Sequence, residues 1–307
     1  MKIIVLGAGK VGSNIAKNLS VQSYDICVVD KAVSKLKKLQ SEYDLAIVSG
    51  HASHPDVLKK AGIDSDTILI SVTNDDEVNI VACQIAKQIF DVKKTICRLS
   101  DSSYIKNLSA FGKEMIDIPI SPELEVTDHI IELIDHPGAE LIETFADGKV
   151  KLVSVKAKRG GKLVNRELKS IKNDIPDIDT FVPTIYRKNK AIVPDGNTVI
   201  KENDQVYFLS AEKNIDSILK EMRDQTVDSS RIMIVGGGMI GSSLASSLEN
   251  KYKVKVLETS LERCEMLSKD LNKAIVLNGD GSDEELLRSE NIENIDCLLY
   301  TSDAADE

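Results

Sequence analysis

The sequence lacks several features that would each point to a different class of protein. Its apolar runs fall well short of the roughly 20 residues that a transmembrane helix requires, so any membrane association is expected to be peripheral. Its five cysteines form no CxxC pair and lie mostly in apolar stretches, which is typical of reduced thiols in a cytosolic protein. Neither a disulfide framework nor a zinc site is therefore expected.

An excess of positive charge is also missing. The chain has 39 Lys and Arg against 49 Asp and Glu, a net charge of -10, and its pI is about 5.1. Broad nucleic-acid binding is therefore not expected, although a local basic patch for phosphates stays open. The amino terminus, MKIIVLG, is too short for a secretory signal and leads straight into a glycine loop, so we interpret it as the first strand.

A glycine-rich motif occurs twice in the chain. The first copy, GAGKVG, comprises Gly7, Ala8, Gly9, Lys10, Val11 and Gly12, and the second copy, GGGMIG, comprises Gly236, Gly237, Gly238, Met239, Ile240 and Gly241. Each copy follows a predicted apolar strand and opens a predicted amphipathic helix. An acidic residue ends the next predicted strand of each copy, Asp30 in ICVVD and Glu258 in VKVLE. The sequence therefore predicts a duplicated nucleotide-binding domain.

The glycines and the acid each have a physical role in such a domain. The first glycine allows a tight turn, the second lets the backbone approach a pyrophosphate, and the third lets the helix pack close to the strand. The amino terminus of the helix offers N–H groups and a positive dipole end to the phosphates. A carboxylate about 20 residues further on binds the ribose hydroxyls. Because both copies have this acid, we prefer this interpretation to glycines that serve only packing.

Residues 1 to about 120 alternate predicted strands and helices, as in a Rossmann-like, doubly wound parallel sheet of the α/β class. Strands are predicted at Ile3–Leu6, Ile26–Val29, Ala46–Val48, Ile68–Val72, Thr95–Leu99 and Met115–Ile118. Pro119 and Pro122 are expected to interrupt regular structure, and a helix is predicted over Glu123–Asp135. The pattern does not decide whether this helix packs on its own domain or on a partner.

The pattern divides the chain into four parts. Residues 1–123 predict the first nucleotide-binding domain, which a crossover helix extends to about residue 138. Residues 139–223 predict a small α+β domain with a hairpin around Lys188–Lys190, and a polar linker follows it. Residues 230–296 predict a truncated second Rossmann-like domain that lacks the fifth and sixth strands and whose fourth strand lies at Ile295 and Asp296. Residues 297–307, CLLYTSDAADE, resemble a translated sequencing adapter, so we expect an artefact outside the fold.

The carboxyl ends of the predicted strands supply further candidates, because ligands of a doubly wound sheet bind there. Thr73 and Asn74 follow the fourth strand and would either bind ribose or base or cap the next helix. Arg98, at the end of the fifth strand, would either clamp a phosphate with two hydrogen bonds or form an ordinary surface ion pair. Lys10 would add charge near the phosphates or remain solvated.

No catalytic or metal-binding group is predicted. Histidine is the usual acid-base group at neutral pH, but His54 precedes Pro55 at a predicted helix start, and no catalytic grouping accompanies it or His51. His129 and His136 flank a predicted helix without metal-ligand spacing. We therefore expect structural roles for the histidines.

The order of GAGKVG, GHASHPDVL, VTNDDEVN, CRLSD, HPGAE, the small domain and GGGMIG closely resembles the TrkA family. Members of this family are peripheral cytoplasmic subunits of bacterial Trk potassium-uptake systems, built from domains that regulate the conductance of potassium (RCK domains). The resemblance runs from Met1 to about Asp296. It implies binding of NAD(H), or of ATP or ADP, no enzymatic activity, and control of a membrane channel subunit of the TrkH or TrkG type.

The resemblance also implies a homo-oligomer on the inner face of the cell membrane and a set of ligand contacts. These contacts are Gly7 to Val11, Asp30, Thr73, Asn74 and Arg98 in the first copy, and Gly236 to Ile240 and Glu258 in the second. Asp280 takes the place of His51 in the second copy, which would give the two sites different nucleotide preferences.

A regulatory subunit and a nicotinamide-dependent oxidoreductase are the two functions considered. The oxidoreductase would also need an acid or base beside the nicotinamide and a substrate pocket, and the small domain offers neither in recognisable form. Asp30 and Glu258 disfavour NADP, because a carboxylate repels a 2′-phosphate. They do not distinguish NAD from ATP or ADP, which carry the same ribose hydroxyl.

Overall fold

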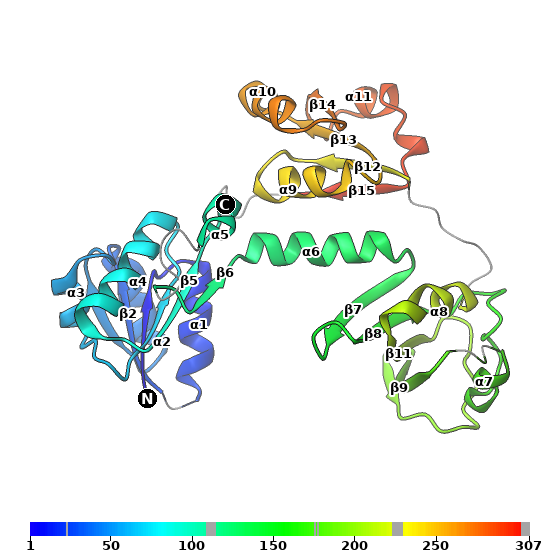
Figure 1. The fold of residues 1–307 in the computed structure, drawn as a ribbon, viewed down its shortest axis with the longest axis horizontal. Coiled ribbons are helices and arrows are strands. Elements are labelled where there is room, and N and C mark those ends of the chain that lie inside the picture. Colours follow the sequence, from blue (N-terminus) through cyan, green and yellow to red (C-terminus); the bar gives the residue numbers. More distant parts are fainter. Residues whose placement is uncertain (23, 109–114, 175, 177, 223–229, 302–307) are drawn as a thin grey trace. The chain divides into compact units, whose positions relative to one another are not determined.

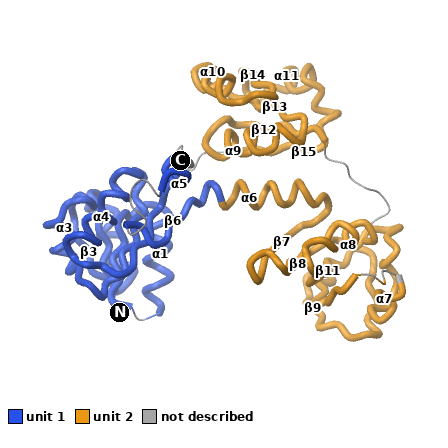
Figure 2. Tube along the Cα trace, viewed as in Figure 1, with its two compact units in different colours: residues 1–124 blue, residues 125–307 orange. Residues whose placement is uncertain are grey.

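The computed structural model describes residues 1–22, 24–108, 115–174, 176, 178–222 and 230–301 (Figure 1). The chain divides into two units, residues 1–124 and residues 125–307 (Figure 2). Among the described residues, none of the helices combines the length and the apolar character that crossing a bilayer would need.

The first unit contains a six-stranded sheet in which every neighbouring pair of strands is parallel, in the order β3-β2-β1-β4-β5-β6. This confirms the predicted Rossmann-like α/β class. Its elements are β1 (Lys2–Leu6), α1 (Lys10–Ser20), β2 (Asp25–Asp30), α2 (Val33–Glu42), β3 (Ala46–Ser49), α3 (Pro55–Lys60), β4 (Ile68–Ser71), α4 (Asp76–Phe90), β5 (Lys94–Arg98), α5 (Ser102–Lys106) and β6 (Ile118–Ile120).

The two faces of this sheet are covered by different helices, because successive side chains of a strand point to opposite faces. Ile4 and Leu6 of β1 pack into one core with residues of α3 and α4. Ile3 and Val5 pack into a second core with residues of α1 and α2. Both faces of the sheet are therefore buried. Because all its strands are parallel, their carboxyl ends lie together at one edge.

The sixth strand was predicted at Met115–Ile118, and this prediction is wrong. Strand β6 is Ile118–Ile120, and Pro119 lies within it, opposite Cys97 of β5. Proline is tolerated there because β6 is an edge strand, in which one side of the backbone needs no ladder donor. Pro122 likewise does not interrupt structure, since it occupies the first helical position of α6, where a missing N–H costs nothing.

The middle of the chain forms a five-stranded antiparallel sheet in the order β10-β9-β11-β8-β7. Its elements, preceded by α6 (Pro122–Asp135), are β7 (Ala139–Phe145), β8 (Val150–Lys156), η2 (Leu168–Ser170), α7 (Ile171–Asp174), β9 (Thr180–Arg187), β10 (Lys190–Ile192), β11 (Gln205–Ala211), η3 (Glu212–Asn214) and α8 (Ile215–Glu221). Lys188 and Asn189 join β9 to β10 with φ angles of 50° and 60°, so the predicted hairpin is confirmed. Most of the predicted linker, residues 223–229, lies outside the described residues.

The second copy of the glycine motif forms a four-stranded parallel sheet in the order β14-β13-β12-β15, which repeats β3-β2-β1-β4 of the first unit. Its elements are β12 (Arg231–Val235), α9 (Met239–Leu248), β13 (Lys253–Glu258), α10 (Leu261–Asp270), β14 (Ile275–Asn278), α11 (Glu284–Ser289), η4 (Ile292–Asn294) and β15 (Cys297–Tyr300). The shared strand order agrees with the predicted duplication, and the truncation of the second domain stays a prediction.

The fourth strand of this copy was predicted at Ile295 and Asp296, with residues 297–307 outside the fold, and the structure corrects this boundary. Strand β15 is Cys297–Tyr300 and pairs with β12, because its alternate apolar residues, Cys297 and Leu299, pack against the core. Residues 302–307 lie outside the described residues, and the adapter origin of the segment stays a prediction.

Helix α6 packs on both neighbouring domains of the second unit. Ile130, Ile131 and Ile134 join the core of the second glycine-motif domain, whereas Leu133 packs against the core of the antiparallel domain. The Asp135 carboxylate also accepts hydrogen bonds from Lys251 and Tyr252, both at 2.6 Å. The helix is therefore a shared structural element of the second unit.

Candidate functional site

The first glycine loop has two glycines that the fold itself requires. Gly7 has a φ of +102°, a conformation that other residues rarely adopt, and a Cβ atom there would lie 2.9 Å from the Val72 carbonyl oxygen. A Cβ atom on Gly12 would lie only 1.9 Å from the Gly7 carbonyl oxygen. The tight turn and the close approach of α1 to β1 thus account for both residues.

Gly9 is different, because nothing in the described protein crowds it. The atom nearest to a Cβ on Gly9 would be Asn74 Oδ1, at 3.8 Å. Gly9 also precedes Lys10 and Val11 as the N-cap of α1, and no side chain among the described residues caps that helix. Helix α4, by contrast, is capped by Asp75, whose carboxylate accepts a hydrogen bond from Val78 N–H. The open space and the uncapped helix start are what a phosphate group would require.

Asp30 joins the glycine loop to the turn after β2. Its Oδ2 accepts a hydrogen bond from Ala8 N–H at 2.6 Å, and its Oδ1 accepts one from Ala32 N–H at 2.7 Å. The carboxylate therefore lies beside the glycine loop, where the ribose of a bound nucleotide would be expected.

The buried side-chain amide of Asn79 links the ends of β4 and β5. Asn79 of α4 is fully buried, and its Oδ1 accepts hydrogen bonds from Ser71 and from the N–H and hydroxyl of Thr73, at 2.7–3.0 Å. Its Nδ2 donates to the carbonyl oxygens of Thr73 and Arg98, at 3.2 and 3.1 Å. Asn79 therefore positions two predicted ligand residues that lie 25 residues apart in the sequence.

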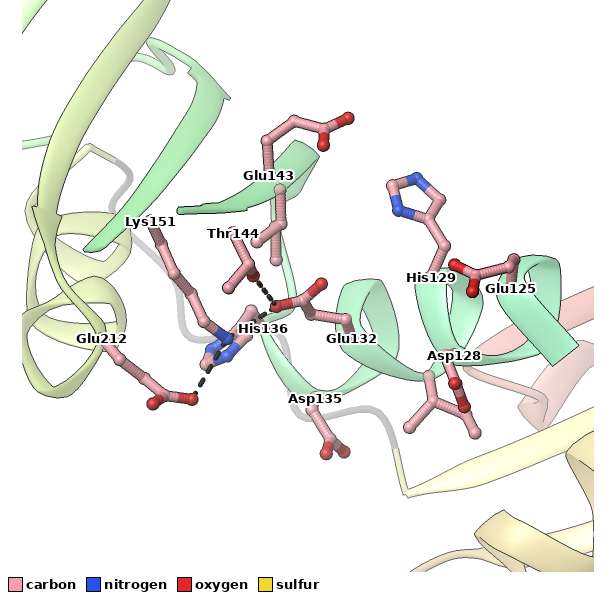
Figure 3. A pocket seen from close by; sticks show the side chains of 12 residues that line it. Glu125, Asp128, His129, Glu132, Asp135, His136, Glu143, Thr144, Lys151 and Glu212 are labelled. Atoms are coloured by element: carbon pink, nitrogen blue, oxygen red, sulfur yellow. Dashed lines mark hydrogen bonds and ion pairs between the residues drawn. The ribbon is translucent and has the colours of Figure 1, made fainter. Parts of the chain in front are cut away.

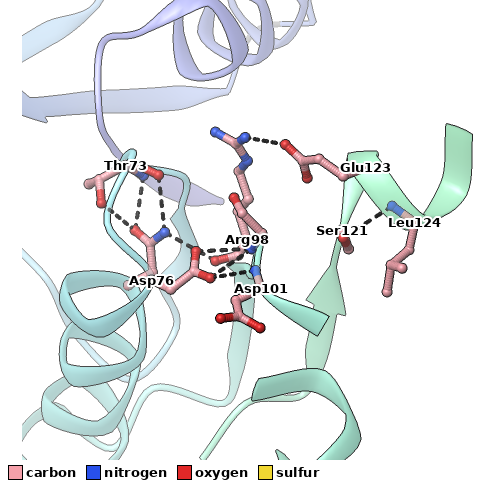
Figure 4. A network of polar contacts seen from close by, with 9 residues as sticks. Thr73, Asp76, Arg98, Asp101, Ser121, Glu123 and Leu124 are labelled. Carbon is pink, nitrogen blue, oxygen red and sulfur yellow. Dashed lines mark hydrogen bonds and ion pairs between the residues drawn. The ribbon is translucent and has the colours of Figure 1, made fainter. Parts of the chain in front are cut away.

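Arg98 forms an ion pair with the start of α6 (Figure 4). Its Nη2 lies 2.5 Å from Oε1 of Glu123, and both side chains are largely buried, with 14% and 13% of their surface exposed. Arg98 thus forms an ion pair in this structure, although a buried one rather than the surface pair considered from the sequence, and the phosphate clamp stays a prediction. The Thr73 hydroxyl also donates to the Asp75 carbonyl oxygen, but the N-cap of α4 is Asp75 itself, so the helix-capping alternative for Thr73 is wrong.

Three residues of this network were missed by the sequence reasoning: Asn79, Asp76 and Glu123. The Asp76 carboxylate accepts hydrogen bonds from Ser100 N–H and Asp101 N–H at 2.8–3.0 Å, which fixes the loop after β5. In the run VTNDDEVN, Asp76 and Asn79 are three residues apart, which puts both on one face of the first turn of α4. That spacing is the one signal that was available for them, and nothing local distinguishes Glu123.

The second glycine loop repeats the geometry of the first. Gly236 has a φ of +107°, and a Cβ on Gly241 would lie 1.9 Å from the Gly236 carbonyl oxygen. Gly238 is the N-cap of α9, which begins with Met239 and Ile240, and within the part of the chain that the structure describes no side chain caps this helix. The two predicted loops thus have the same backbone arrangement.

Glu258 takes the place of Asp30 in this copy. Its Oε2 accepts a hydrogen bond from Gly237 N–H and its Oε1 one from Ser260 N–H, both at 2.7 Å. Burial by itself raises the pKa of Glu258, but the hydrogen bonds from Ser260 and Gly237 outweigh burial and hold the pKa below its usual range. The side chain is therefore ionised at neutral pH.

His51 and Asp280 have the same local role in the two copies. His51 Nδ1 lies 3.0 Å from the Ser53 hydroxyl, and Asp280 Oδ1 accepts hydrogen bonds from the hydroxyl and N–H of Ser282, both at 2.8 Å. Burial, with smaller effects of Lys31 and His54, lowers the pKa of His51. Both side chains thus stabilise the turn after the third strand of their copy.

A separate hollow of about 520 Å³ lies along α6 and the antiparallel sheet (Figure 3). Lys151 is buried there, and its Nζ lies 2.6 Å from Glu132 and 3.1 Å from Glu212. Burial opposes the charged form of Lys151, but these two carboxylates raise its pKa above the usual value. The ion pair between Lys151 and Glu132 connects the small domain to α6 (Figure 3). None of the residues that line this hollow is a predicted ligand residue.

Along the chain, a Rossmann-like glycine-loop domain, a small antiparallel domain and a second glycine-loop domain follow one another. This order defines a protein with duplicated Rossmann-like domains of the nucleotide-binding type. Comparison with family models gives a match to the TrkA-N domain over residues 3–122 and 232–307 and to the TrkA-C domain over residues 152–223. The Trk system potassium uptake protein TrkA of Halomonas elongata is 44% identical over 307 residues, which are 99% of this chain and 67% of that protein. The chain therefore belongs to the TrkA family.

The chain spans about two thirds of the length of this relative. Among solved structures, the GsuK channel bound to NAD has a TM-score of 0.67 at 14% identity. The match covers 99% of this chain and 53% of the GsuK chain. The GsuK structure bound to ADP has a TM-score of 0.55 at 12% identity, covering 98% of this chain and 53% of that chain. These likenesses show the fold, and the name of the relative describes a potassium uptake protein rather than an enzyme.

Proposed function

We propose that this chain is a regulatory, non-enzymatic part of a potassium uptake system that binds NAD(H), or ATP or ADP, and controls a membrane channel subunit of the TrkH or TrkG type. The proposal assigns the nucleotide sites to the two glycine loops of this chain. The observation that carries it is the open space at Gly9, beside an uncapped helix start and the Asp30 carboxylate.

The residues at the two loops fit an adenine nucleotide. Gly9, Lys10 and Val11 at the start of α1 would face the phosphates, Asp30 would accept hydrogen bonds from the ribose, and Thr73, Asn74 and Arg98 would complete the site. In the second copy, Gly238, Met239, Ile240 and Glu258 would have the corresponding roles. The solved structures named above, bound to NAD and to ADP, support both ligands on this fold.

Regulation requires that the nucleotide binds two conformations with different affinity, because a ligand with equal affinity for both shifts nothing. A coupling free energy of about 1–3 kcal/mol is typical and would change the open probability of a channel severalfold or more. Helix α6 is a suitable connection, since it begins directly after the first sheet and packs on both domains of the second unit. We further propose a homo-oligomer on the cytoplasmic face of the cell membrane.

A glycine-to-alanine series tests the nucleotide site. Gly9→Ala is expected to leave the free energy of unfolding within about 1 kcal/mol of the original, because φ at Gly9 is -74° and its Cβ meets no close atom. It is expected to weaken binding of NAD and ADP at the first site by at least about tenfold, because the methyl group would take the space of a phosphate, and to leave the second site unchanged. Isothermal titration calorimetry and thermal unfolding measure the two effects.

Two further variants are the controls. Gly196→Ala in the small domain, where the nearest atom to the new Cβ is 3.5 Å away, is expected to bind as the original chain does. Gly12→Ala is expected to disrupt the fold, because its Cβ would lie 1.9 Å from a backbone oxygen. Binding by Gly9→Ala with the same stoichiometry and the same affinities as the original chain would remove the assigned first site. Turnover of NADH with a small carbonyl substrate would overturn the regulatory interpretation.

A further inference from the structure

The Arg98 guanidinium is only half engaged by its partner. The Nη2 group contacts Oε1 of Glu123, whereas Nε is buried and has no hydrogen-bond partner among the residues that the structure describes. The N–H bonds of Nε and Nη2 point along one edge of the guanidinium, and this edge matches two oxygens of one carboxylate or phosphate. A buried donor left without an acceptor calls for an explanation. Here the edge is held by a single oxygen.

Glu123 is held at this edge by the start of α6. Pro122 and Glu123 form the first helical positions, and the buried Ser121 caps the helix by accepting a hydrogen bond from Leu124 N–H. Figure 4 shows the Glu123 side chain extending from the start of this helix toward Arg98. This charged contact therefore joins the helix start to the end of β5, in addition to the pairing of β5 with β6 just before the helix.

Arg98 is also linked to the glycine-loop side of the sheet. Its carbonyl oxygen accepts a hydrogen bond from Asn79, which binds the backbone and hydroxyl of Thr73 as well. Thr73 lies against Gly7, since a Cβ on Gly7 would be 3.1 Å from Thr73 N. The ion pair with Glu123 thus belongs to the same edge of the sheet as the candidate nucleotide site.

We propose, on the basis of the nucleotide site proposed above, that Glu123 is an internal competitor of the ligand phosphate for Arg98. A phosphate oxygen and a carboxylate oxygen are both anionic acceptors. They would repel each other if they occupied the same edge of the guanidinium together. When the phosphate takes both donors of Arg98, Glu123 is displaced and the first turn of α6 loses this side-chain contact to β5, while the pairing of β6 with β5 remains. Ligand binding thereby loosens the first turn of the helix that enters the second unit.

Calorimetry with ADP on the whole chain, in buffer containing EDTA, tests this competition. The chelator is needed because a divalent cation would bridge carboxylate and phosphate and reverse the sign of the effect. Glu123→Gln keeps the shape of the side chain and removes its charge, and it is expected to bind ADP about tenfold more tightly than the original chain. Glu42→Gln, the same charge change at an exposed position of α2, is the matched control and is expected to bind as the original does.

A double variant assigns the effect to Arg98. In an Arg98→Gln background, the additional Glu123→Gln change is expected to leave the ADP affinity unchanged, because the contested guanidinium is gone. Unchanged or weaker binding by Glu123→Gln, in a chain whose original form binds ADP, would overturn the competition but not the nucleotide site. Absence of ADP and NAD binding by the original chain would instead overturn the proposed function.

Hydrogen exchange on the original chain provides a second measurement that needs no variant. Peptides covering residues 121–127 are expected to exchange at least about fivefold faster in saturating ADP than without it, because the start of α6 loses a tertiary contact. Exchange that stays the same or slows in these peptides would contradict the displacement of Glu123.

Discussion

At the scale of single residues, the first glycine-motif domain depends on polar side chains that lie outside the motif itself. Asn79 makes hydrogen bonds to the ends of both β4 and β5 while fully buried. Asp76 fixes the loop after β5 in the same way. The sequence identified Thr73 and Arg98 because they follow predicted strands, but it could not identify Asn79, since a helical asparagine reveals its partners only when two strands are brought beside it.

The replacement Asn79→Asp is expected to destabilise the first unit by about 2–4 kcal/mol. The carboxylate cannot donate to the carbonyl oxygens of Thr73 and Arg98, and a charge would be buried between them. Urea unfolding followed by circular dichroism measures the loss. Asn107→Asp is the matched control, because exposed Asn107 also donates one hydrogen bond to a carbonyl oxygen, and a change within about 0.5 kcal/mol is expected there. Equal losses in both variants would contradict this role of Asn79.

At the scale of elements, the periodicity of the sequence predicted α6 to within one residue of its observed start. It did not predict where the helix packs, because the same apolar stripe suits any apolar surface. The structure places Ile130, Ile131 and Ile134 against the second glycine-motif domain. Strand β7 was not identified, since only Ile142 of its seven residues is buried and the alternation is weak.

The truncation Ile134→Ala is expected to lower the free energy of unfolding of the second unit by about 2–4 kcal/mol, because a buried side chain is removed from a packed core. Ile134 is 7% exposed, whereas Val126 on the same helix is 45% exposed. Val126→Ala is therefore the control, with an expected change within about 0.5 kcal/mol. Denaturant unfolding compares the two, and an Ile134→Ala loss no larger than that of Val126→Ala would show that α6 does not pack there in solution.

At the scale of the whole molecule, the residues predicted to bind nucleotide in the first copy all lie within residues 1–124. This unit has its own cores on the two faces of its sheet. Gly9, Asp30, Thr73 and Arg98 are therefore positioned by contacts internal to one unit. The second unit contains the second copy together with the antiparallel domain.

A fragment of residues 1–124 is accordingly expected to fold and to bind ADP at least as tightly as the first site of the whole chain does, because it keeps the candidate site and loses most of the helix that holds Glu123 at Arg98. Calorimetry on the two proteins gives the comparison, and circular dichroism confirms that the fragment is folded. A folded fragment that binds ADP far more weakly than the whole chain would show that the first site needs residues of the second unit.

The sequence by itself determined the duplicated glycine loops, the acid that follows each, the parallel direction of the strands in the glycine-loop domains and the position of the small α+β domain along the chain. These follow from local chemistry, since a glycine with positive φ, a helix start and an apolar strand are each set by a few neighbouring residues. Only the tertiary structure decided the partners of Arg98 and Asn79, the strand register at Pro119 and the surfaces covered by α6. Those depend on which distant segments meet in space, and the physical reason is that a charge, an amide or an apolar stripe is compatible with many partners until packing selects one.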